Sequence, residues 1–373
     1  MPKKTSILFD AYHLYHLPQF DPVIDLLAQD NRFELFLSTS NNIDEEERAL
    51  SLSILDKRPG TVIKAETEQA RSGMIRELAP DVFICGWSRY ELERFIPGST
   101  LVGMIYHGIG VKPSYWRDNH KRLDVRFVEG EYRIQQLRDQ GIETDLALTG
   151  FTKLDPLFHD NEEQEKKLTR MLDLDPGKKT ILFAPTFYPS SLEKFGMHLG
   201  ELTKDYNVIL KLHMWVHFMD RFGDINLGPQ RRLANKLMEK YDHIKLVGPE
   251  IYNFVHLYKL ADVLLTDASS TIYEIIALEK PVIVNRFLKL KFIHRLFRSR
   301  LYRNRLDDEM DRDISNFCFE LKQPTDLPSI VETAFNKNDQ RLDVVRRYQK
   351  KMLFKLDGQA SVRVRDYILD KFN

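Results

Sequence analysis

The stretch "DVLLTDASSTIYEIIALEKPVIV", from Asp262 to Val284, decides the fold. A short apolar run is interrupted by a polar group, a helix-like pattern follows, and a second apolar run ends the stretch. Apolar runs of this length are typical of buried parallel strands, and strand–helix–strand is the repeating unit of a parallel sheet. The polar group, which contains Asp267, Ser269, Ser270 and Thr271, falls where the first strand meets the helix.

The same alternation runs along the whole chain. The predicted strands of the first half are "TSILFD", "FELFLS", "TVIKA", "DVFICG", "LVGMIYHG", "VRFVEG" and "DLALTG". Those of the second half are "KTILFAPT", "YNVILKLH", "HIKLVGP", "DVLLTD" and "PVIVNR". Helix-like segments lie between them near 44–55, 66–78, 131–140, 193–204, 230–241, 252–260 and 271–278.

This alternation predicts an α/β protein with two Rossmann-like, doubly wound domains that face a central cleft, the layout of a GT-B fold. The polar seam "HDNEEQEKKLTRMLDLDPGKK" separates the two series of strands. We therefore expect domains at 1–160 and 161–373. The tail from 326 onward contains only helix-like segments and is assigned to the second domain.

Composition excludes several classes of protein. The chain has 373 residues, a hydrophobic fraction of 43%, and 55 basic against 55 acidic residues. The balanced charge argues against a dedicated nucleic-acid-binding protein, and no nucleic-acid partner is expected. The two cysteines, Cys85 and Cys318, match no metal or disulfide pattern. No apolar stretch approaches the ~20 residues that cross a bilayer, so we expect a cytoplasmic protein.

Polar residues terminate several predicted strands. His107 and Gly108 follow "GMIY", Gly150 follows "DLALT", and Thr186, Lys211, His213 and Asp267 stand at the ends of four later strands. Ligands of open α/β sheets bind outside the carboxyl ends of the strands. These side chains are therefore the candidates for a site.

His107 lies in "YHGIGVKPSYW", where Gly108 and Gly110 allow close approach and Lys112 supplies a cation. Imidazole titrates near pH ~6.5 and can take a proton from a hydroxyl group, which suggests a general base. The alternative is a buried histidine bonded to a turn. Lys211 and His213 share one face of a strand. Either both side chains donate to phosphate oxygens, or both are only solvated at the end of the strand.

The polar group of the opening stretch has two interpretations. Thr271 and Glu274 have the spacing of a capping box, which predicts Thr271 as the N-cap of the helix. One cap suffices for one helix, so Ser269 and Ser270 remain over, next to free N–H groups and the positive end of the helix dipole. That arrangement favours binding of an anion, phosphate in particular.

The segment 286–305, "RFLKLKFIHRLFRSRLYRNR", carries eight basic residues and no acid, interleaved with apolar side chains. It either lies on an anionic membrane surface, binds a polyanionic substrate, or is a solvated face. The acidic "LDDEMDRD" that follows can neutralise it within the protein. The basic residues are Arg286, Lys289, Lys291, Arg295, Arg298, Arg300, Arg303 and Arg305.

Taken together, these motifs resemble the CDP-glycerol glycerophosphotransferases, the teichoic-acid primases and polymerases. The matching elements are "YHGIGVK" (106–112), "GFTKLD" (150–155), "APT" (184–186), "LKLH" (210–213), "TDASS" (266–270) and "EKP" (279–281), in the family's order and spacing.

The resemblance implies a GT-B-like fold and transfer of glycerol phosphate from CDP-glycerol to a hydroxyl of a glycan or glycolipid acceptor, with release of CMP. It implies that His107 is the base and that His213 stabilises the pyrophosphate or the transition state. Asp267, Ser269 and Ser270 would line the CDP site, with Lys211, Thr186 and Thr271 beside them. Gly108, Lys112, Gly150 and Asp155 would complete the cleft.

By the same resemblance the N-terminal domain takes the acceptor, the C-terminal domain holds the donor, and neither a metal nor a cofactor is required. Teichoic-acid or capsule polysaccharide biosynthesis at the inner face of the plasma membrane follows, with addition of one or a few units preferred over long-chain polymerisation.

Several positions depart from the family pattern. Tyr106 replaces Trp, Ile109-Gly110 replaces Thr-Pro, Thr152-Lys153-Leu154 replaces Pro-Arg-Asn, Ala268 replaces Tyr, and Met214 replaces Pro. These departures leave the polyol of the donor open. They also leave open a GT-B glycosyltransferase or epimerase that uses a UDP-sugar, and a non-catalytic nucleotide-binding module of a polysaccharide-assembly complex.

Overall fold

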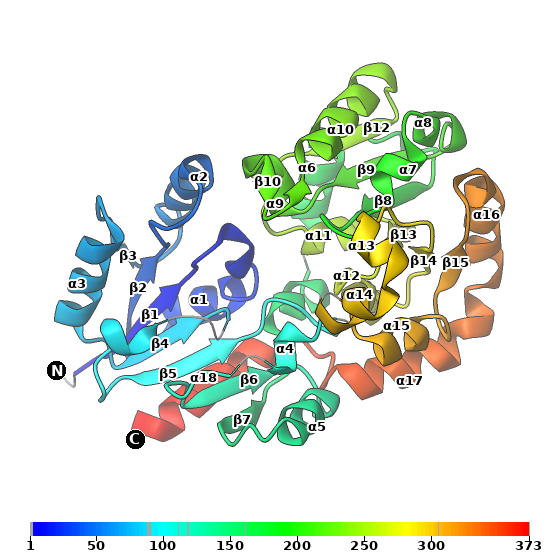
Figure 1. Ribbon diagram of the computed structural model, residues 1–373. Coiled ribbons are helices and arrows are strands. Elements are labelled where there is room, and N and C mark those ends of the chain that lie inside the picture. Colours follow the sequence, from blue (N-terminus) through cyan, green and yellow to red (C-terminus); the bar gives the residue numbers. More distant parts are fainter. Residues whose placement is uncertain are drawn as a thin grey trace. The chain divides into compact units, whose positions relative to one another are not determined.

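The computed structural model of the protein describes residues 3–87, 91–110, 112–117, 119–160, 162–304 and 306–372. Arg305 lies outside these residues, and so does Val111 of the "YHGIGVK" element. The described chain forms two compact units (Figure 1). Unit 1 contains the chain up to His107, Tyr115–His159 and the chain from Lys350 onward, and unit 2 contains Gly108–Ser114 and Asp160–Gln349.

Unit 1 is built on a parallel sheet whose described strands run in the order β3-β2-β1-β4-β5-β6-β7 (Figure 1). The sheet is buried because most of these strands are apolar on both faces. The strands are β1 (Thr5–Asp10), β2 (Phe33–Ser38), β3 (Thr61–Val62), β4 (Val82–Cys85), β5 (Leu101–Ile105), β6 (Val125–Val128) and β7 (Asp145–Leu148).

Unit 2 has a second parallel sheet with its described strands in the order β12-β9-β8-β13-β14-β15. Its strands are β8 (Thr180–Ala184), β9 (Asn207–Lys211), β12 (Ile244–Val247), β13 (Val263–Thr266), β14 (Val282–Asn285) and β15 (Phe319–Leu321). The edge strand β15 and the short hairpin β10 (Arg221–Phe222) and β11 (Ile225–Asn226) were not predicted, because each is too short to show a pattern.

Each predicted helix-like segment contains an α-helix, and further short α-helices lie outside these segments. The expected helix near 193–204 is two helices, because Gly196 adopts φ +56° between them. The α-helices are α1 (Asp21–Ala28), α2 (Glu45–Leu55), α3 (Glu68–Leu78), α4 (Ser114–Arg117), α5 (Glu131–Asp139), α6 (Glu162–Met171), α7 (Leu192–Phe195), α8 (His198–Leu202), α9 (Met214–Phe218), α10 (Gly228–Lys240), α11 (Val255–Leu260), α12 (Thr271–Ile275), α13 (Phe292–Leu296), α14 (Arg298–Asn304), α15 (Asp308–Ile314), α16 (Leu327–Lys337), α17 (Leu342–Met352) and α18 (Ala360–Phe372).

Short 3-10 helices connect these elements. They are η1 (Leu14–His16), η2 (Leu92–Arg94), η3 (Thr152–Phe158), η4 (Ile276–Leu278), η5 (Pro324–Asp326) and η6 (Asp339–Arg341).

The end of the chain does not stay in the second domain as the sequence predicted. Helix α17 carries the chain back to unit 1, where α18 packs against α1. The carboxylate of Asp155 accepts the backbone N–H of Ala360 (3.1 Å) and of Ser361 (2.7 Å), and therefore caps the first turn of α18. Helix amphipathicity shows that a helix packs, but not which sheet it packs on.

Candidate functional site

The predicted residues from Thr186 onward stand at the carboxyl ends of three neighbouring strands of unit 2. Strand β8 lies between β9 and β13 in the sheet, so Thr186 after β8, His213 after β9 and the Asp267–Ser270 segment after β13 share one edge. The sequence could not show this adjacency, because the order of strands in a sheet is not the order in the chain. The shared edge is where an open parallel sheet binds its ligand.

Asp267 holds this edge together instead of facing solvent. Its fully buried carboxylate accepts the backbone N–H of Thr186 at 2.9 Å and of Ser191 at 3.3 Å, and the side-chain amide of Asn285 lies 3.4 Å away. Burial raises the pKa of Asp267 to about 6, against an ordinary 3.8, although these hydrogen bonds oppose the rise. The residue therefore fixes the loop after β8, which carries Thr186, relative to β13.

The raised pKa of Asp267 predicts a specific pH dependence of stability. The folded state binds this proton more tightly than the unfolded state, so the stabilisation is complete below pH 3.8 and is lost as the pH rises through about 6. In Asp267→Asn this loss, about 3 kcal/mol at most, should be absent. Urea unfolding of both proteins across this pH range measures the difference. Parallel curves would contradict the assignment.

The predicted capping box is wrong. The N-cap of α12 is Ser270, which has helical φ and ψ and makes no side-chain capping bond, and Thr271 is the first helical residue. Thr271 is buried and its hydroxyl lies 3.3 Å from that of Thr266, while Glu274 accepts the hydroxyl of Tyr258 at 2.8 Å. Both side chains of the expected box are therefore used by the core.

Ser269 and Ser270 remain the accessible polar residues of this loop. Both are half-buried, whereas Asp267, Ala268 and Thr271 are buried. The hydroxyl of Ser269 lies 3.4 Å from the backbone nitrogen of Thr271, which is at the limit of a hydrogen bond. Their use in binding phosphate stays a prediction.

His213 is the N-cap of α9, and this fixes the role of its ring. The backbone N–H of Trp215 donates to its Nδ1 at 3.3 Å, so Nδ1 carries no proton. In the neutral ring the proton is then on Nε2, which is a hydrogen-bond donor. The rings of Phe187 and Trp215 pack on His213 with centroids 4.8 and 5.3 Å away. These aromatic neighbours were not predictable from the sequence, because strand ends alone do not reveal contacts between loops.

The two predicted lysines, Lys211 and Lys112, have different surroundings. Lys211 is buried and donates to the carbonyl of Gly248 at 3.0 Å, and burial lowers its pKa to about 8. It is therefore a link between β9 and the loop after β12. Lys112 belongs to the segment Gly108–Ser114 of unit 2 and lies over the ring of Phe187, 5.9 Å from its centroid. The structure thus brings Lys112 and His213 to the same aromatic side chain.

Gly110 of this segment must be a glycine, because of its backbone conformation and its close packing. Gly110 has φ +66°, and a Cβ there would lie 2.4 Å from Cε2 of Tyr273 on α12. Gly108 of the same segment is buried. Gly110 therefore packs closely on Tyr273 of the helix that begins at the Ser269–Ser270 loop.

In unit 1, His107 has the opposite ring arrangement from His213. Its Nδ1 lies 2.9 Å from the carbonyl oxygen of Gly86. A carbonyl can only accept, so Nδ1 carries the proton, and in the neutral ring Nε2 is the basic nitrogen. Its ring lies among those of Tyr15, His16 and Tyr115, with centroids 5.2, 4.9 and 5.2 Å away. The signal for this cluster in the sequence is the "AYHLYH" that follows the first strand.

The "GFTKLD" element serves the end of the chain. Gly150 has φ +91°, and a Cβ there would lie 2.8 Å from the carbonyl oxygen of Phe354. Asp155, at the other end of the element, caps α18. Both contacts are with the chain's own C-terminal segment, which accounts for these two residues without a ligand.

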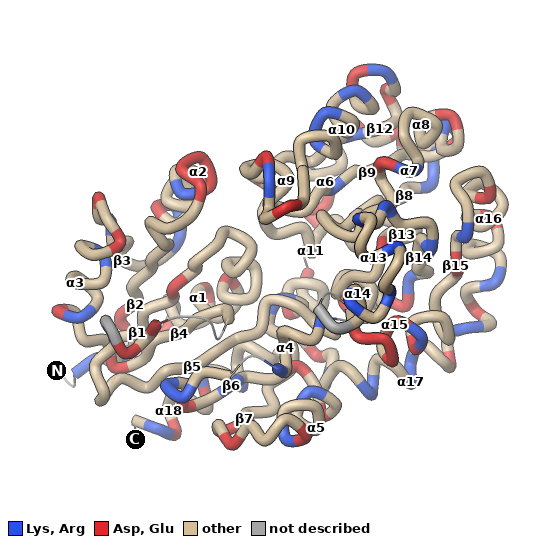
Figure 2. The backbone as a smooth tube through the Cα atoms, in the orientation of Figure 1, with Lys and Arg blue, Asp and Glu red and all other residues tan. Residues whose placement is uncertain are grey.

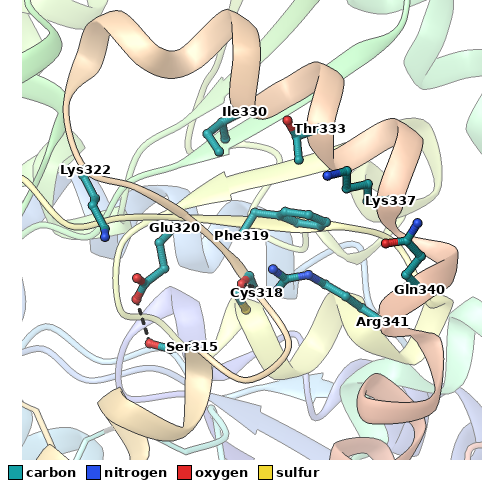
Figure 3. A pocket seen from close by; sticks show the side chains of 10 residues that line it. All are labelled: Ser315, Cys318, Phe319, Glu320, Lys322, Ile330, Thr333, Lys337, Gln340 and Arg341. Atoms are coloured by element: carbon teal, nitrogen blue, oxygen red, sulfur yellow. Dashed lines mark hydrogen bonds between the residues drawn. The ribbon is translucent and has the colours of Figure 1, made fainter.

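A pocket of about 410 Å³ lies elsewhere in unit 2, at the edge strand β15 (Figure 3). Residues of β15, α16 and η6 line it, among them Glu320, Lys337 and Arg341, and Glu320 accepts the hydroxyl of Ser315 at 2.6 Å. None of the predicted site residues lines this pocket. It is therefore separate from the site at the ends of β8, β9 and β13.

The basic segment 286–305 divides into two parts. Arg286 pairs with Asp311 (2.9 Å) and Glu320 (2.8 Å), Lys289 with Glu193 (2.6 Å), and Lys291 with Asp224. The acidic stretch after the segment therefore neutralises Arg286, as predicted. Figure 2 shows the acidic residues of α15 and the basic residues of α13 and α14.

Between Phe292 and Arg300 most side chains are exposed. Phe292, Leu296 and Phe297 expose 68, 59 and 52% of their surface. Arg295, Arg298 and Arg300 are exposed as well, and these three make no ion pair within the described part of the chain. In the described residues no helix is both long and apolar enough to cross a membrane.

Solved structures define the class of fold. The wall teichoic acid polymerase TagF matches with a TM-score of 0.70 at 15% identity, over 98% of this chain and 88% of that chain. UDP-GlcNAc 2-epimerase from Neisseria meningitidis, bound to UDP-GlcNAc, matches with a TM-score of 0.60 at 15% identity, over 98% of this chain and 100% of that one. The two parallel α/β sheets and the helical C-terminal region confirm the predicted GT-B-like class.

The chain belongs to the CDP-glycerol:poly(glycerophosphate) glycerophosphotransferase family, whose sequence model matches residues 139–370, more than half of the chain. This confirms the resemblance that the motifs indicated. His107, Gly108 and Lys112 lie outside the matched residues, so their roles depend on the residue-level argument.

Curated relatives cover a smaller region. The teichoic acid poly(glycerol phosphate) polymerase of Bacillus subtilis (strain 168) is 30% identical over 147 residues, which are 36% of this chain and 18% of that protein. The protein of the same name from Bacillus spizizenii is 28% identical over 147 residues, 36% of this chain and 33% of that protein. The matched region thus spans less than two thirds of the length of either relative.

Proposed function

We propose that this protein transfers a polyol phosphate, in the simplest case glycerol phosphate, from a CDP-activated donor to a hydroxyl of a cell-surface glycan or glycolipid, and releases CMP. The observation that carries the proposal is the opposite protonation of two histidines. His107 has its basic nitrogen at Nε2, and His213 has its proton at Nε2. Phosphoryl transfer to an alcohol is assisted by a base for the hydroxyl and by a donor for the charge that develops on the phosphate, and the two histidines are suited to these two tasks.

The reaction assigns one task to each residue. His107 Nε2 takes the proton of the acceptor hydroxyl, whose oxygen attacks the phosphorus that carries the polyol. The bond from this phosphorus to the bridging oxygen breaks, and CMP leaves with the electron pair. His213 Nε2–H donates to the phosphate oxygens as charge develops, and Ser269 and Ser270 hold the donor. The proton on His107 is then lost to water, and no cofactor takes part.

The test is incubation of the protein with CDP-glycerol, CDP-ribitol and UDP-sugars in turn, with a panel of glycan and glycolipid acceptors. Release of CMP from a CDP-polyol, dependent on acceptor, is the expected result. Release of UDP without CMP would contradict the proposal.

A second candidate is a reaction on a UDP-sugar, because the Neisseria meningitidis epimerase shares the fold over nearly the whole chain. An epimerase produces no free nucleotide from its sugar donor during a full turnover, so sugar analysis separates it from a transferase. A non-catalytic module would bind CDP without turnover, and thermal shift with CDP and CMP measures that binding.

We place the protein at the inner face of the plasma membrane, in contact with anionic lipid through residues 292–300. Three exposed apolar side chains and three exposed arginines interleave there. The guanidinium of Arg295 lies over Phe292 and that of Arg300 over Phe297, at 6.0 and 5.4 Å from the ring centroids. Apolar side chains flanked by arginines suit the boundary between headgroups and acyl chains.

Replacing Phe292, Leu296 and Phe297 together by serine should weaken binding to vesicles that contain phosphatidylglycerol at least about tenfold, because apolar burial is lost. Cosedimentation with vesicles measures this. The matched control replaces the exposed Met171 and Met238 of the same unit and should bind as the wild type does. Equal binding of the triple variant, or binding to soluble poly(glycerol phosphate) in place of vesicles, would contradict the membrane assignment.

A further inference from the structure

His16 is a buried histidine without an evident structural purpose. It ends η1, after β1, and is fully buried. In the described part of the chain neither of its ring nitrogens has a hydrogen-bond partner. Burial, with smaller effects from His107 and His13, holds its pKa well below 6.5, so the ring is neutral. Since the ring nitrogens make no hydrogen bond to a described residue, what His16 contributes must come from the packing of its ring.

The location of His16 indicates what this packing contributes. Strand β1 has β2 on one side and β4 on the other, and the chain reaches β2 first and β4 only later, so the order of strands reverses between β1 and β4. Such a reversal opens a crevice at the carboxyl ends of the strands. His16 follows β1, Gly86 follows β4 and His107 follows β5. The three residues meet at this point of the sheet.

Gly86 links the two histidines. A Cβ on Gly86 would lie 2.7 Å from Cγ of His16 and 2.9 Å from its Cβ, so the side chain of His16 occupies the space beside this α-carbon. The carbonyl oxygen of the same residue holds Nδ1 of His107 at 2.9 Å. The rings of His16 and His107 are also in direct contact, with centroids 4.9 Å apart.

We propose that His16 is a positioning residue for His107. Its ring fixes the Gly86 peptide whose carbonyl holds the Nδ1 proton of His107, and this keeps Nε2 of His107 as the basic nitrogen. The contact acts through shape, since the ring nitrogens of His16 bond to no described residue.

The neighbours of the two rings are consistent with this role. His13 pairs with the buried Glu47, 3.1 Å from Oε1 and 3.2 Å from Oε2, and its ring centroid is 6.0 Å from that of His16. Tyr15 packs on both rings, at 4.5 Å from His16 and 5.2 Å from His107. A neutral His16 adds no positive charge beside His107 when the latter takes a proton.

The test measures the tautomer of His107 directly, by long-range proton–nitrogen correlation spectra of histidine-labelled protein without substrate. The His107→Gln spectrum assigns the signals. In His16→Ala the His107 proton should distribute over both nitrogens, and kcat for CMP release should fall about 100-fold with KM for the donor unchanged. His16→Phe retains a ring of similar shape and should retain both the tautomer and kcat.

Two results would overturn the inference. One is His16→Ala with an unchanged His107 tautomer and unchanged kcat. The other is His16→Phe with the native tautomer but a kcat as low as that of His16→Ala, which would assign a direct role to the His16 nitrogens. If His16→Ala does not fold, Gly86→Ala can be used instead, because its Cβ forces the Gly86 backbone and the His16 ring apart. An unchanged His107 tautomer in Gly86→Ala would also contradict the inference.

The catalytic consequence rests on the proposed function, whereas the tautomer does not. If the wild-type protein releases no CMP, the proposed function is contradicted. If the tautomer of His107 is nevertheless shifted in His16→Ala, the positioning role of His16 is still supported.

Discussion

His107→Gln should lower kcat for CMP release about 1,000-fold, within the range that general base catalysis contributes. The variant removes the basic Nε2 nitrogen, while the half-buried position of the side chain tolerates an amide of similar length. KM for the CDP-donor should change little, because His107 acts on the acceptor hydroxyl. Initial rates over a range of donor concentrations separate the two constants.

The matched control for this variant is His198→Gln. His198 is an exposed histidine at the start of α8 and is not among the predicted site residues. Its replacement should leave kcat and the unfolding midpoint unchanged. If His107→Gln retains the kcat of the wild type, His107 is not the general base, even if CMP release by the wild type is established.

Replacing His213 should also lower kcat strongly. Comparing two replacements separates the effect on kcat from the effect on the free energy of unfolding. His213→Asn keeps a side-chain oxygen that can accept the N–H of Trp215, because asparagine is a good N-cap. It loses the Nε2–H donor, so kcat should fall about 100- to 1,000-fold, as when an oxyanion donor is removed. His213→Ala should lose a similar factor in rate and about 1 kcal/mol of stability as well.

Kinetics and urea unfolding of the two variants check this expectation together. A His213→Asn protein with normal kcat would show that the ring is only a cap. If the asparagine and alanine variants lose equal stability, the hydrogen bond to Trp215 N–H is not what the ring contributes to folding.

The fold was largely predictable because buried parallel strands leave a strong local signal. The strands from "TSILFD" to "PVIVNR" are present in the structure at the predicted places. The path of the chain end was not predictable. The contacts that bring the segment from Lys350 onward to unit 1, such as Asp155 with Ser361, join residues far apart in sequence and follow no local pattern.

The places of the candidate residues at the ends of strands were predictable from the sequence, but the contacts of their side chains were not. Asp267 and Thr271 follow the end of β13, yet both are buried, and the difference between a ligand contact and a core contact lies in tertiary packing. The neighbours of His107 and His213, among them His16 and Phe187, come from loops after other strands. A capping-box spacing was equally misleading, because Tyr258 competes for Glu274.

Ala268 shows how one departure from the family pattern is accommodated. The family motif has a tyrosine there, whereas this chain has an alanine that packs with Leu301 of α14 and with Leu306. The space that a larger side chain at position 268 would fill is occupied by Leu301 and Leu306. A tyrosine introduced at position 268 would compete with Leu301 for this space. The small residue at 268 and Leu301 of α14 are therefore matched in size, so that enlarging the first calls for a smaller side chain at the second.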